Sequence, residues 1–269
     1  MVPPTLDPEA LAQDFLALLG QDLPEQRYQE FLESNTALIP REFVQNHGVH
    51  LQLVLRKLRL GADFVTDFFL LSKSSADWNC VAIELEKPQS RYFRGTTGTD
   101  LHSDFNKALE QIHQWKSWFL NPVNLAHFTD HILGPLRVPL SYNRCYMKYV
   151  LVMGRRSEFG SDQNRKNTIA SREAEDLKIM TYDSLAEDLV SKGPLYVGIR
   201  NNDHFHIASP EYVSEFLFHW VETSQLTISQ ALKDDIEANR HRWRVYSTGT
   251  SLSNAQLSLD SRLPQIKVV

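Results

Sequence analysis

The sequence predicts an α/β fold in which a mixed central sheet is flanked by helices and followed by a C-terminal helical extension. With 42% hydrophobic and 23% charged residues among 269, the composition is typical of a soluble globular protein with a core of normal size. Apolar runs of strand length are separated by segments whose apolar residues recur at helical spacing. The order is a helical start, three strands, a helix, a strand, and a further strand–helix pair. This order is typical of a sheet covered by helices.

The first half of the chain contains two predicted helices and three predicted strands. We expect one helix at residues 8–19 and a second that starts after Pro24 and runs to about Ser34. Strands are expected at Val49–Leu60, Phe64–Leu71 and Cys80–Glu86, with a turn at Asp77–Asn79. The first strand alternates apolar and polar residues, which predicts one face in the core. The other two are almost wholly apolar, which indicates strands covered on both faces.

The second half begins with a predicted helix over Asp104–Phe119, whose apolar stripe recurs at helical spacing. Strands are expected at Tyr146–Met153, Leu177–Thr181 and Leu195–Ile199, and helices at 210–222 and 226–242. The predicted organisation is a helical lead at 1–23, a main domain at 24–200, helices packed on the core at 201–246, and a tail at 247–269. The tail is rich in Ser, Thr, Asn and Gln, so we expect it to be flexible.

Nothing in the sequence predicts a membrane span or a secretory signal. No run approaches the roughly 20 apolar residues needed to cross a bilayer. The apolar stretch Phe15–Leu19 follows acidic rather than basic residues, unlike a signal peptide. The two cysteines, Cys80 and Cys145, do not form a disulfide framework. We therefore expect a cytoplasmic protein with no membrane partner.

The formal net charge of −5 is unevenly distributed. Residues 1–40 carry seven acidic residues and one basic residue, whereas residues 134–172 carry eight basic and two acidic ones. A basic segment on an acidic protein can still hold phosphates. A run of charge is also compatible with a face that only contacts solvent. The candidates for nucleic-acid contacts are Arg155, Arg156, Arg165 and Lys166.

An acidic group is predicted where two apolar strands meet. Asp67 interrupts the second strand, and Glu84, Glu86 and Lys87 end the third. Because side chains alternate along a strand, Glu84 and Glu86 should share one face, and a hairpin would bring Asp67 beside them. Carboxylates forced together raise one another's pKa, and a divalent cation such as Mg²⁺ or Mn²⁺ relieves the repulsion. The non-functional alternative is that Glu84 and Glu86 lie at an exposed strand end and face solvent.

Gln111 is the next candidate, because it lies beside the apolar stripe of the helix over Asp104–Phe119. From there its side chain can reach the edge of the sheet near the acidic residues. The alternative is an ordinary polar residue at the border of a buried face.

Six short segments, taken in order, resemble the Shedu nuclease domain, a branch of the PD-(D/E)XK restriction-endonuclease-like superfamily. They are Glu25–Leu38, Val65–Phe68, Ala82–Pro88 (AIELEKP), Ala108–Trp115, Val152–Arg155 and Ile179–Leu185 (IMTYDSL). The resemblance covers about residues 24–190. It implies a restriction-endonuclease-like fold, metal-dependent cleavage of DNA, and a role in bacterial defence against phage.

The resemblance also implies roles for individual residues. Asp67 and Glu84 would be metal ligands, and Gln111 and Glu25 would support the site. Glu86 occupies the position where most of the superfamily has lysine, and Lys87, one step later, is the candidate to take over that role. Strict alternation sends Lys87 to the face opposite Glu84. Either the strand ends or bulges there, or Glu86 itself acts as a ligand or general base.

Three hypotheses follow from the sequence. The first is a Mg²⁺-dependent DNA endonuclease, with pairing of copies expected because DNA-cutting domains often use symmetry to reach both strands. The second is a non-catalytic nucleic-acid-binding or regulatory protein on the same fold, favoured by the missing lysine. The third is an interaction protein that binds no nucleic acid.

Overall fold

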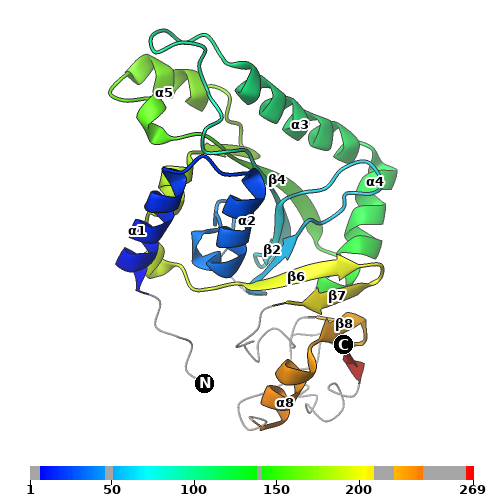
Figure 1. The fold of residues 1–269 in the computed structure, drawn as a ribbon. Helices are drawn as coiled ribbons and strands as arrows, with labels where there is room; N and C mark the ends of the chain where they lie inside the picture. The colour runs from blue at the N-terminus through cyan, green and yellow to red at the C-terminus, as the bar shows by residue number, and fades with distance from the viewer. Residues whose placement is uncertain (1–6, 46–50, 138–140, 209–220, 239–264) are drawn as a thin grey trace.

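The computed structural model describes residues 7–45, 51–137, 141–208, 221–238 and 265–269 (Figure 1). One nine-stranded mixed sheet forms the centre, in the order β5-β4-β3-β2-β1-β6-β7-β8-β9. The strands are β1 (Leu53–Arg56), β2 (Phe68–Lys73), β3 (Asp77–Leu85), β4 (Arg144–Val152), β5 (Leu177–Met180), β6 (Tyr196–Asn201), β7 (His204–Ile207), β8 (Leu226–Ile228) and β9 (Lys267–Val268). The predicted mixed α/β architecture is therefore present.

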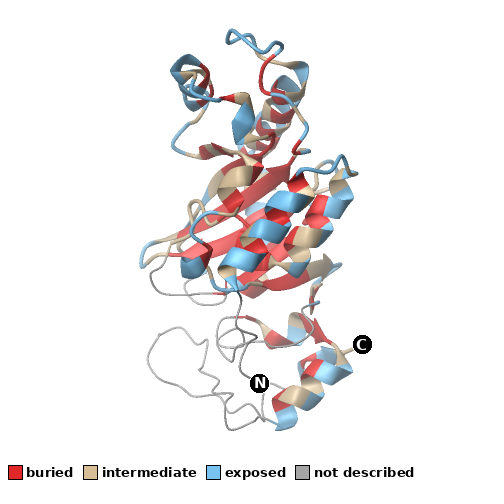
Figure 2. Cartoon of the chain, turned by 60° about the vertical axis from the view of Figure 1, so that its left-hand side comes forward, coloured by how far each residue is buried: buried red, intermediate tan, exposed pale blue. Residues whose placement is uncertain are grey.

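Helices cover both faces of this sheet. They are α1 (Pro8–Leu19), α2 (Glu25–Ser34), α3 (Ser103–Phe119), α4 (Pro122–Ala126), α5 (Gln163–Ala170), α6 (Tyr182–Leu185) and α8 (Gln230–Ala238), with short 3₁₀ and π turns between them. The buried residues concentrate in the strands and on the helix sides turned toward them (Figure 2). In the described part of the chain, no helix is long and apolar enough to cross a membrane.

Two apolar cores lie on the two sides of the sheet. One contains the α3 stripe (Phe105, Ala108, Ile112, Trp115, Phe119) with Trp78, Cys80 and Ala82 of β3. The other contains residues of α1 and α2 with Val81, Ile83 and Leu85 of β3. Alternate residues of β3 therefore enter opposite cores, as predicted for a strand covered on both faces.

The boundaries of the first strands differ from the predicted ones. β1 is only four residues long because Gln52 and Lys57, on either side of it, have left-handed backbones with φ of 50° and 47°. The turn predicted at Asp77–Asn79 is wrong, because those residues begin β3. The chain turns earlier, where the Ser74 hydroxyl accepts hydrogen bonds from the N–H groups of Ala76 and Asp77.

The C-terminal region also departs from the prediction. Residues 226–228 form strand β8 rather than the start of a helix, and the helix begins at Gln230. The last residues of the expected tail form β9, which pairs with β8, and Ile266 beside it is buried. Most of the helix predicted at 210–222 and most of the tail lie outside the described residues, and residues 221 and 222 are not helical. The sheet continues past residue 200 through β7, which pairs with β6.

Candidate active site

Asp67 and Glu84 lie side by side across two antiparallel strands. Phe68 of β2 pairs with Ile83 of β3, and the Asp67 N–H donates to the Ile83 carbonyl at 3.2 Å. Continuing this register by one residue places Asp67 opposite Glu84. The Asp67 carboxylate is fixed in turn, since its Oδ2 accepts from the Leu85 N–H at 2.7 Å. The hairpin predicted to join the two acidic positions is therefore present.

Glu84 is a buried carboxylate, with only 8% of the residue exposed. Gln111, which α3 places over this end of β3, donates from Nε2 to Glu84 Oε1 at 2.5 Å. Burial, and then the negative charges of Asp67, Glu86 and Glu25, raise the pKa of Glu84 well above its ordinary value. The contact expected of Gln111 is present, and Glu84 does not face open solvent.

Glu86 and Lys87 follow the strand rather than continue it. β3 ends at Leu85, and the Glu86 N–H donates to the Val152 carbonyl at 2.9 Å. Glu86 is half-buried, and its pKa is raised mainly by burial and then by the charges of Glu25, Asp104 and Asp67. Lys87 is exposed. The sequence left open whether the strand ends or bulges at this point, and in the structure it ends.

Glu25 adds a fourth carboxylate to the group. It is the first residue of α2, directly after Pro24, and an acidic residue is favoured at a helix N-terminus. Burial and then the charge of Asp67 raise its pKa, while Lys57 and Lys87 lower it. The elements α2, β2 and β3 thus contribute to one acidic cluster, defined here as Glu25, Asp67, Glu84 and Glu86.

The chemistry of the acidic cluster suits a hard divalent cation, because its donors are carboxylate oxygens that repel one another. Tyr182 gives an independent sign of a missing polar ligand. Its ring is fully buried, and its hydroxyl has no hydrogen-bond partner among the described residues. Burial, and then the charges of Asp67, Glu25 and Glu86, raise the pKa of this hydroxyl. A buried hydroxyl near carboxylates but without a partner favours water or a ligand between them.

The cluster is not a finished coordination sphere. Among the residues that the structure describes, no three His, Cys, Asp or Glu side chains are arranged ready to hold a metal ion. The carboxylate donors therefore suit a divalent cation chemically. To bind one, the carboxylates would have to move closer together.

Lys57 is a site residue that the sequence interpretation missed. Its ammonium group forms an ion pair with Asp67 Oδ1, and the Asp67 side chain is only 7% exposed. The left-handed backbone of Lys57 ends β1, so the residue stands outside the alternating pattern that was used to predict the strand. The signal that could have found it is a lysine directly after a strand that pairs with the Asp67 strand.

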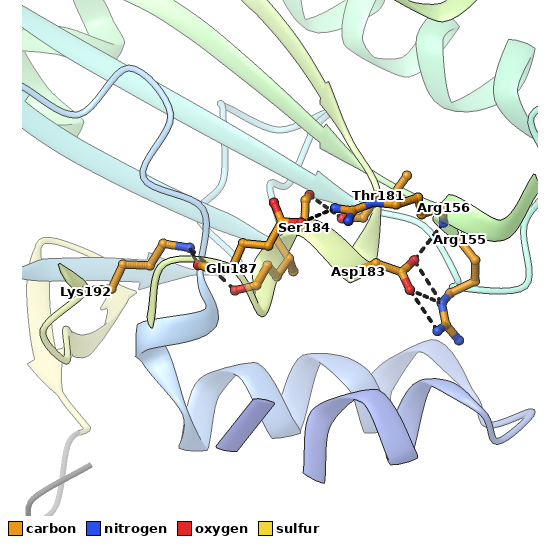
Figure 3. Close-up of polar contacts among 8 residues, drawn as sticks. Arg155, Arg156, Thr181, Asp183, Ser184, Glu187 and Lys192 are labelled. Carbon is orange, nitrogen blue, oxygen red and sulfur yellow. Dashed lines mark hydrogen bonds and ion pairs between the residues drawn. The ribbon is translucent and has the colours of Figure 1, made fainter. Parts of the chain in front are cut away.

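Arg155 is partly buried, and the protein itself occupies its guanidinium group. Its guanidinium group makes a two-pronged ion pair with Asp183, at 2.9–3.2 Å (Figure 3). It also donates to the Leu19 carbonyl at the end of α1. The Arg156 N–H donates to the same carboxylate at 2.7 Å. These bonds lower the pKa of Asp183 although burial opposes them. The contacts join the segments Val152–Arg155 and Ile179–Leu185 to α1, which is a structural role.

Arg165 is also used internally. Its side chain is 4% exposed and donates to the carbonyls of Gly95, Gly98 and Glu158 at 2.6–2.8 Å. The guanidinium group also lies over the Phe93 ring. Arg165 thus fixes the loop that contains Gly95 and Gly98.

Arg156 and Lys166 keep their side chains at the surface. Arg156 pairs there with Glu187, and both side chains are 54% exposed. Lys166 is exposed on α5, next to the buried Arg165. Of the four basic candidates, these two are placed where a phosphate can reach them.

Comparison with protein-family models gives a match to a large part of the chain. Residues 22–186 match the family model described as "Shedu protein SduA, C-terminal". A comparison with curated proteins finds no match. The matched span contains every residue of the acidic cluster together with Lys57, Gln111 and Asp183. Since it covers more than half of the 269 residues, the chain belongs to the Shedu family.

Proposed function

We propose that this protein is a metal-dependent deoxyribonuclease that hydrolyses phosphodiester bonds in defence against phage. Membership of the Shedu family supports the defence role. The nuclease activity is carried by one observation, the buried pairing of Asp67 with Glu84 across the β2–β3 hairpin. Among the described ion pairs, Lys57 balances Asp67, and Glu84 has no positive partner. A buried carboxylate of this kind is costly to the fold, and a catalytic metal would provide the missing positive charge.

Asp67, Glu84 and Glu86 are the residues that would hold Mg²⁺ or Mn²⁺. A divalent ion bound there would lower the pKa of a bound water and stabilise negative charge on the phosphate. The chain's own groups keep the ligands in place. The Leu85 N–H orients Asp67, and the Gln111 amide orients Glu84. With a metal bound there, the arrangement would correspond to a restriction-endonuclease-like site.

DNA is the proposed substrate, and a pair of copies would serve its two strands. Arg156 and Lys166 would contact the backbone. Contacts of this kind position a duplex without selecting its base sequence. We therefore expect cleavage that depends on DNA ends, shape or assembly more than on sequence.

The proposal is tested with purified protein and both plasmid and linear DNA, in Mg²⁺, Mn²⁺ or EDTA. Wild type should cleave only with metal, and Asp67→Ala and Glu84→Ala should each lose at least about 100-fold in rate. Glu110→Ala is the matched control, because Glu110 is an exposed acidic residue next to Gln111 on α3. Equal rates in wild type and the two site variants would refute the nuclease assignment.

The presence of Glu86 at the usual lysine position favours a second candidate, a non-catalytic DNA-binding protein on this fold. That function predicts no cleavage under any metal condition and unchanged DNA affinity in Asp67→Ala. Absence of DNA binding even at low salt, where phosphate contacts are strongest, would argue against both candidates.

A further inference from the structure

Lys57, Asp67 and Glu84 form one row across three neighbouring strands. Arg56 of β1 pairs with Phe68 of β2, and Phe68 pairs with Ile83 of β3. One step further along both registers, Lys57 stands opposite Asp67 and Asp67 opposite Glu84. The Lys57 N–H donates to the Asp67 carbonyl at 2.9 Å, so the backbone supports the row.

The side chain of Lys57 joins the buried row to the solvent. Its side chain is 50% exposed, while its ammonium group meets the Asp67 carboxylate, which is almost wholly buried. Positive charge at this place lowers the pKa of both Glu84 and Glu25. Lys57 therefore places a positive charge within the cluster, on the side that solvent can reach.

Lys87, the lysine next to the superfamily position, is placed differently. It lies beyond the end of β3, in a turn where its carbonyl accepts from the Ser90 N–H at 3.0 Å and the Gly154 N–H at 3.2 Å. Its charge acts on Glu25 but is not among the causes that shift the pKa of Glu84. Its backbone is held while its side chain is exposed, so nothing directs it toward Asp67.

We propose that Lys57, rather than Lys87, is the lysine of this site, and that its ammonium group binds the non-bridging oxygens of the DNA phosphate presented to the acidic cluster. This inference rests on the proposed nuclease function. Before DNA binds, the same ammonium group balances Asp67. An ammonium group is a compact charge that suits a phosphate oxygen, and a preorganised donor at such a place acts most strongly when negative charge develops.

The test compares Lys57→Gln and Lys57→Arg with Lys87→Gln as the matched control, all in the full chain. In Mg²⁺, Lys57→Gln should cleave DNA about 100-fold more slowly than wild type, Lys57→Arg should recover part of the loss, and Lys87→Gln should stay within about threefold. Circular dichroism and thermal unfolding establish that each variant is folded.

Two further measurements do not depend on turnover. In Ca²⁺, Lys57→Gln should bind a short DNA duplex at least about fivefold more weakly than wild type, and Lys87→Gln less than twofold. Mn²⁺ should raise the Tm of wild type and Lys57→Gln equally, because Lys57 is not a metal ligand, while Asp67→Ala should lose this response.

The outcomes separate the two proposals. Cleavage by wild type together with normal cleavage and binding by Lys57→Gln would overturn the role of Lys57 and leave the nuclease intact. Loss of the Mn²⁺ response in Lys57→Gln would also overturn it, since the lysine would then organise the ligands only. If wild type binds DNA in Ca²⁺ without cleaving it in Mg²⁺, the nuclease proposal fails. The comparison of DNA binding by Lys57→Gln and Lys87→Gln then still tests whether Lys57 contacts the phosphate. No DNA binding by wild type would refute both.

Discussion

At the scale of single residues, the acidic cluster shows how a site weakens the fold that holds it. Asp67 and Glu84 are both buried, and the described contacts give them one lysine, one backbone N–H and one amide. A carboxylate with a raised pKa is harder to ionise in the folded chain than in the unfolded chain. Charge at Glu84 is therefore a cost to the metal-free fold, which a cation would remove.

This cost predicts that Glu84→Gln stabilises the protein when metal is absent. The pKa of Glu84 is raised, so wild-type stability falls as the pH rises above about 4.5 and levels off beyond the folded-state pKa. Removing the carboxylate removes the cost of ionising it in the folded chain, so Glu84→Gln should be more stable than wild type at pH 8.

Urea unfolding in EDTA at pH 5 and pH 8 measures this effect. The gain should shrink as the pH is lowered toward 5, because the raised pKa of Glu84 favours protonation of the wild-type carboxyl. The exposed control Glu110→Gln should show little change at either pH. A Glu84→Gln variant less stable than wild type at pH 8 would contradict the electrostatic account.

Arg165 carries a second residue-scale prediction, since the structure makes it a loop anchor. Arg165→Lys keeps the charge but cannot reach three separate carbonyls, so we expect a loss on the order of 2–4 kcal/mol. Lys166→Ala, one residue away and exposed, should change stability by less than about 0.5 kcal/mol. Chemical denaturation of both variants measures their free energies of unfolding. Similar stabilities would show that the carbonyl contacts contribute little.

At the scale of elements, the close approach of two segments depends on Gly154. It follows β4 with a φ of +57°, and an added Cβ would lie 2.7 Å from the Tyr92 ring and 2.9 Å from the Ser90 carbonyl oxygen. The Gly154 carbonyl accepts a hydrogen bond at 3.2 Å from the N–H of Tyr182, the first residue of α6. This glycine therefore sets how the segment before Arg155 meets the segment that carries Asp183.

We expect Gly154→Ala to destabilise the protein by about 2–4 kcal/mol, because backbone strain adds to the clash with Tyr92 and Ser90. Gly160→Ala is a close control. Gly160 also has a positive φ, of 51°, but a Cβ there would meet nothing within 4 Å. It should lose only about 1–2 kcal/mol for the left-handed backbone. Thermal unfolding of the two variants measures the difference, and equal losses would mean that the packing at Gly154 is easily relieved.

Element positions were predictable from the sequence where one strong pattern acts alone. The apolar runs around Phe68 and Ile83 predict the β2–β3 hairpin, and the stripe that includes Trp115 predicts α3 and the reach of Gln111. The start of β3 was not predictable in this way, because Asp77, Trp78 and Asn79 have the composition of a turn. Burial of Trp78 in the core decides their conformation, and that is a tertiary effect.

The lysine at position 57 was missed for a related reason. The alternating pattern suggests that Val49–Leu60 is one strand, yet the left-handed residue at position 57 ends it and turns the ammonium group to Asp67. Charge counts likewise attract attention to Arg155 and Arg165. A count contains no information on which guanidinium groups the fold uses internally.

At the scale of the whole molecule, the net charge of −5 is a poor guide to DNA binding. Seven acidic residues lie in the first forty, where α1 and α2 cover one side of the sheet. The basic residues of positions 134–172 lie elsewhere, and the structure divides them into internal anchors and exposed side chains. Long-range repulsion of DNA is screened beyond about 8–10 Å at moderate salt, so local contacts determine binding.

The exposed pair Arg156 and Lys166 should therefore set the salt dependence of DNA affinity. Removing one phosphate-binding side chain reduces the slope of log K against log salt by about 0.9, so Arg156→Gln and Lys166→Gln should each lower the slope by about one. The loss of affinity should be the same for duplexes of different sequence. Arg27→Gln is the control, because Arg27 is also exposed but lies in the acidic segment and pairs with Glu30. Fluorescence anisotropy between 50 and 200 mM salt measures all three variants. If Arg27→Gln weakens binding as much as the other two, net charge rather than its distribution governs the encounter with DNA.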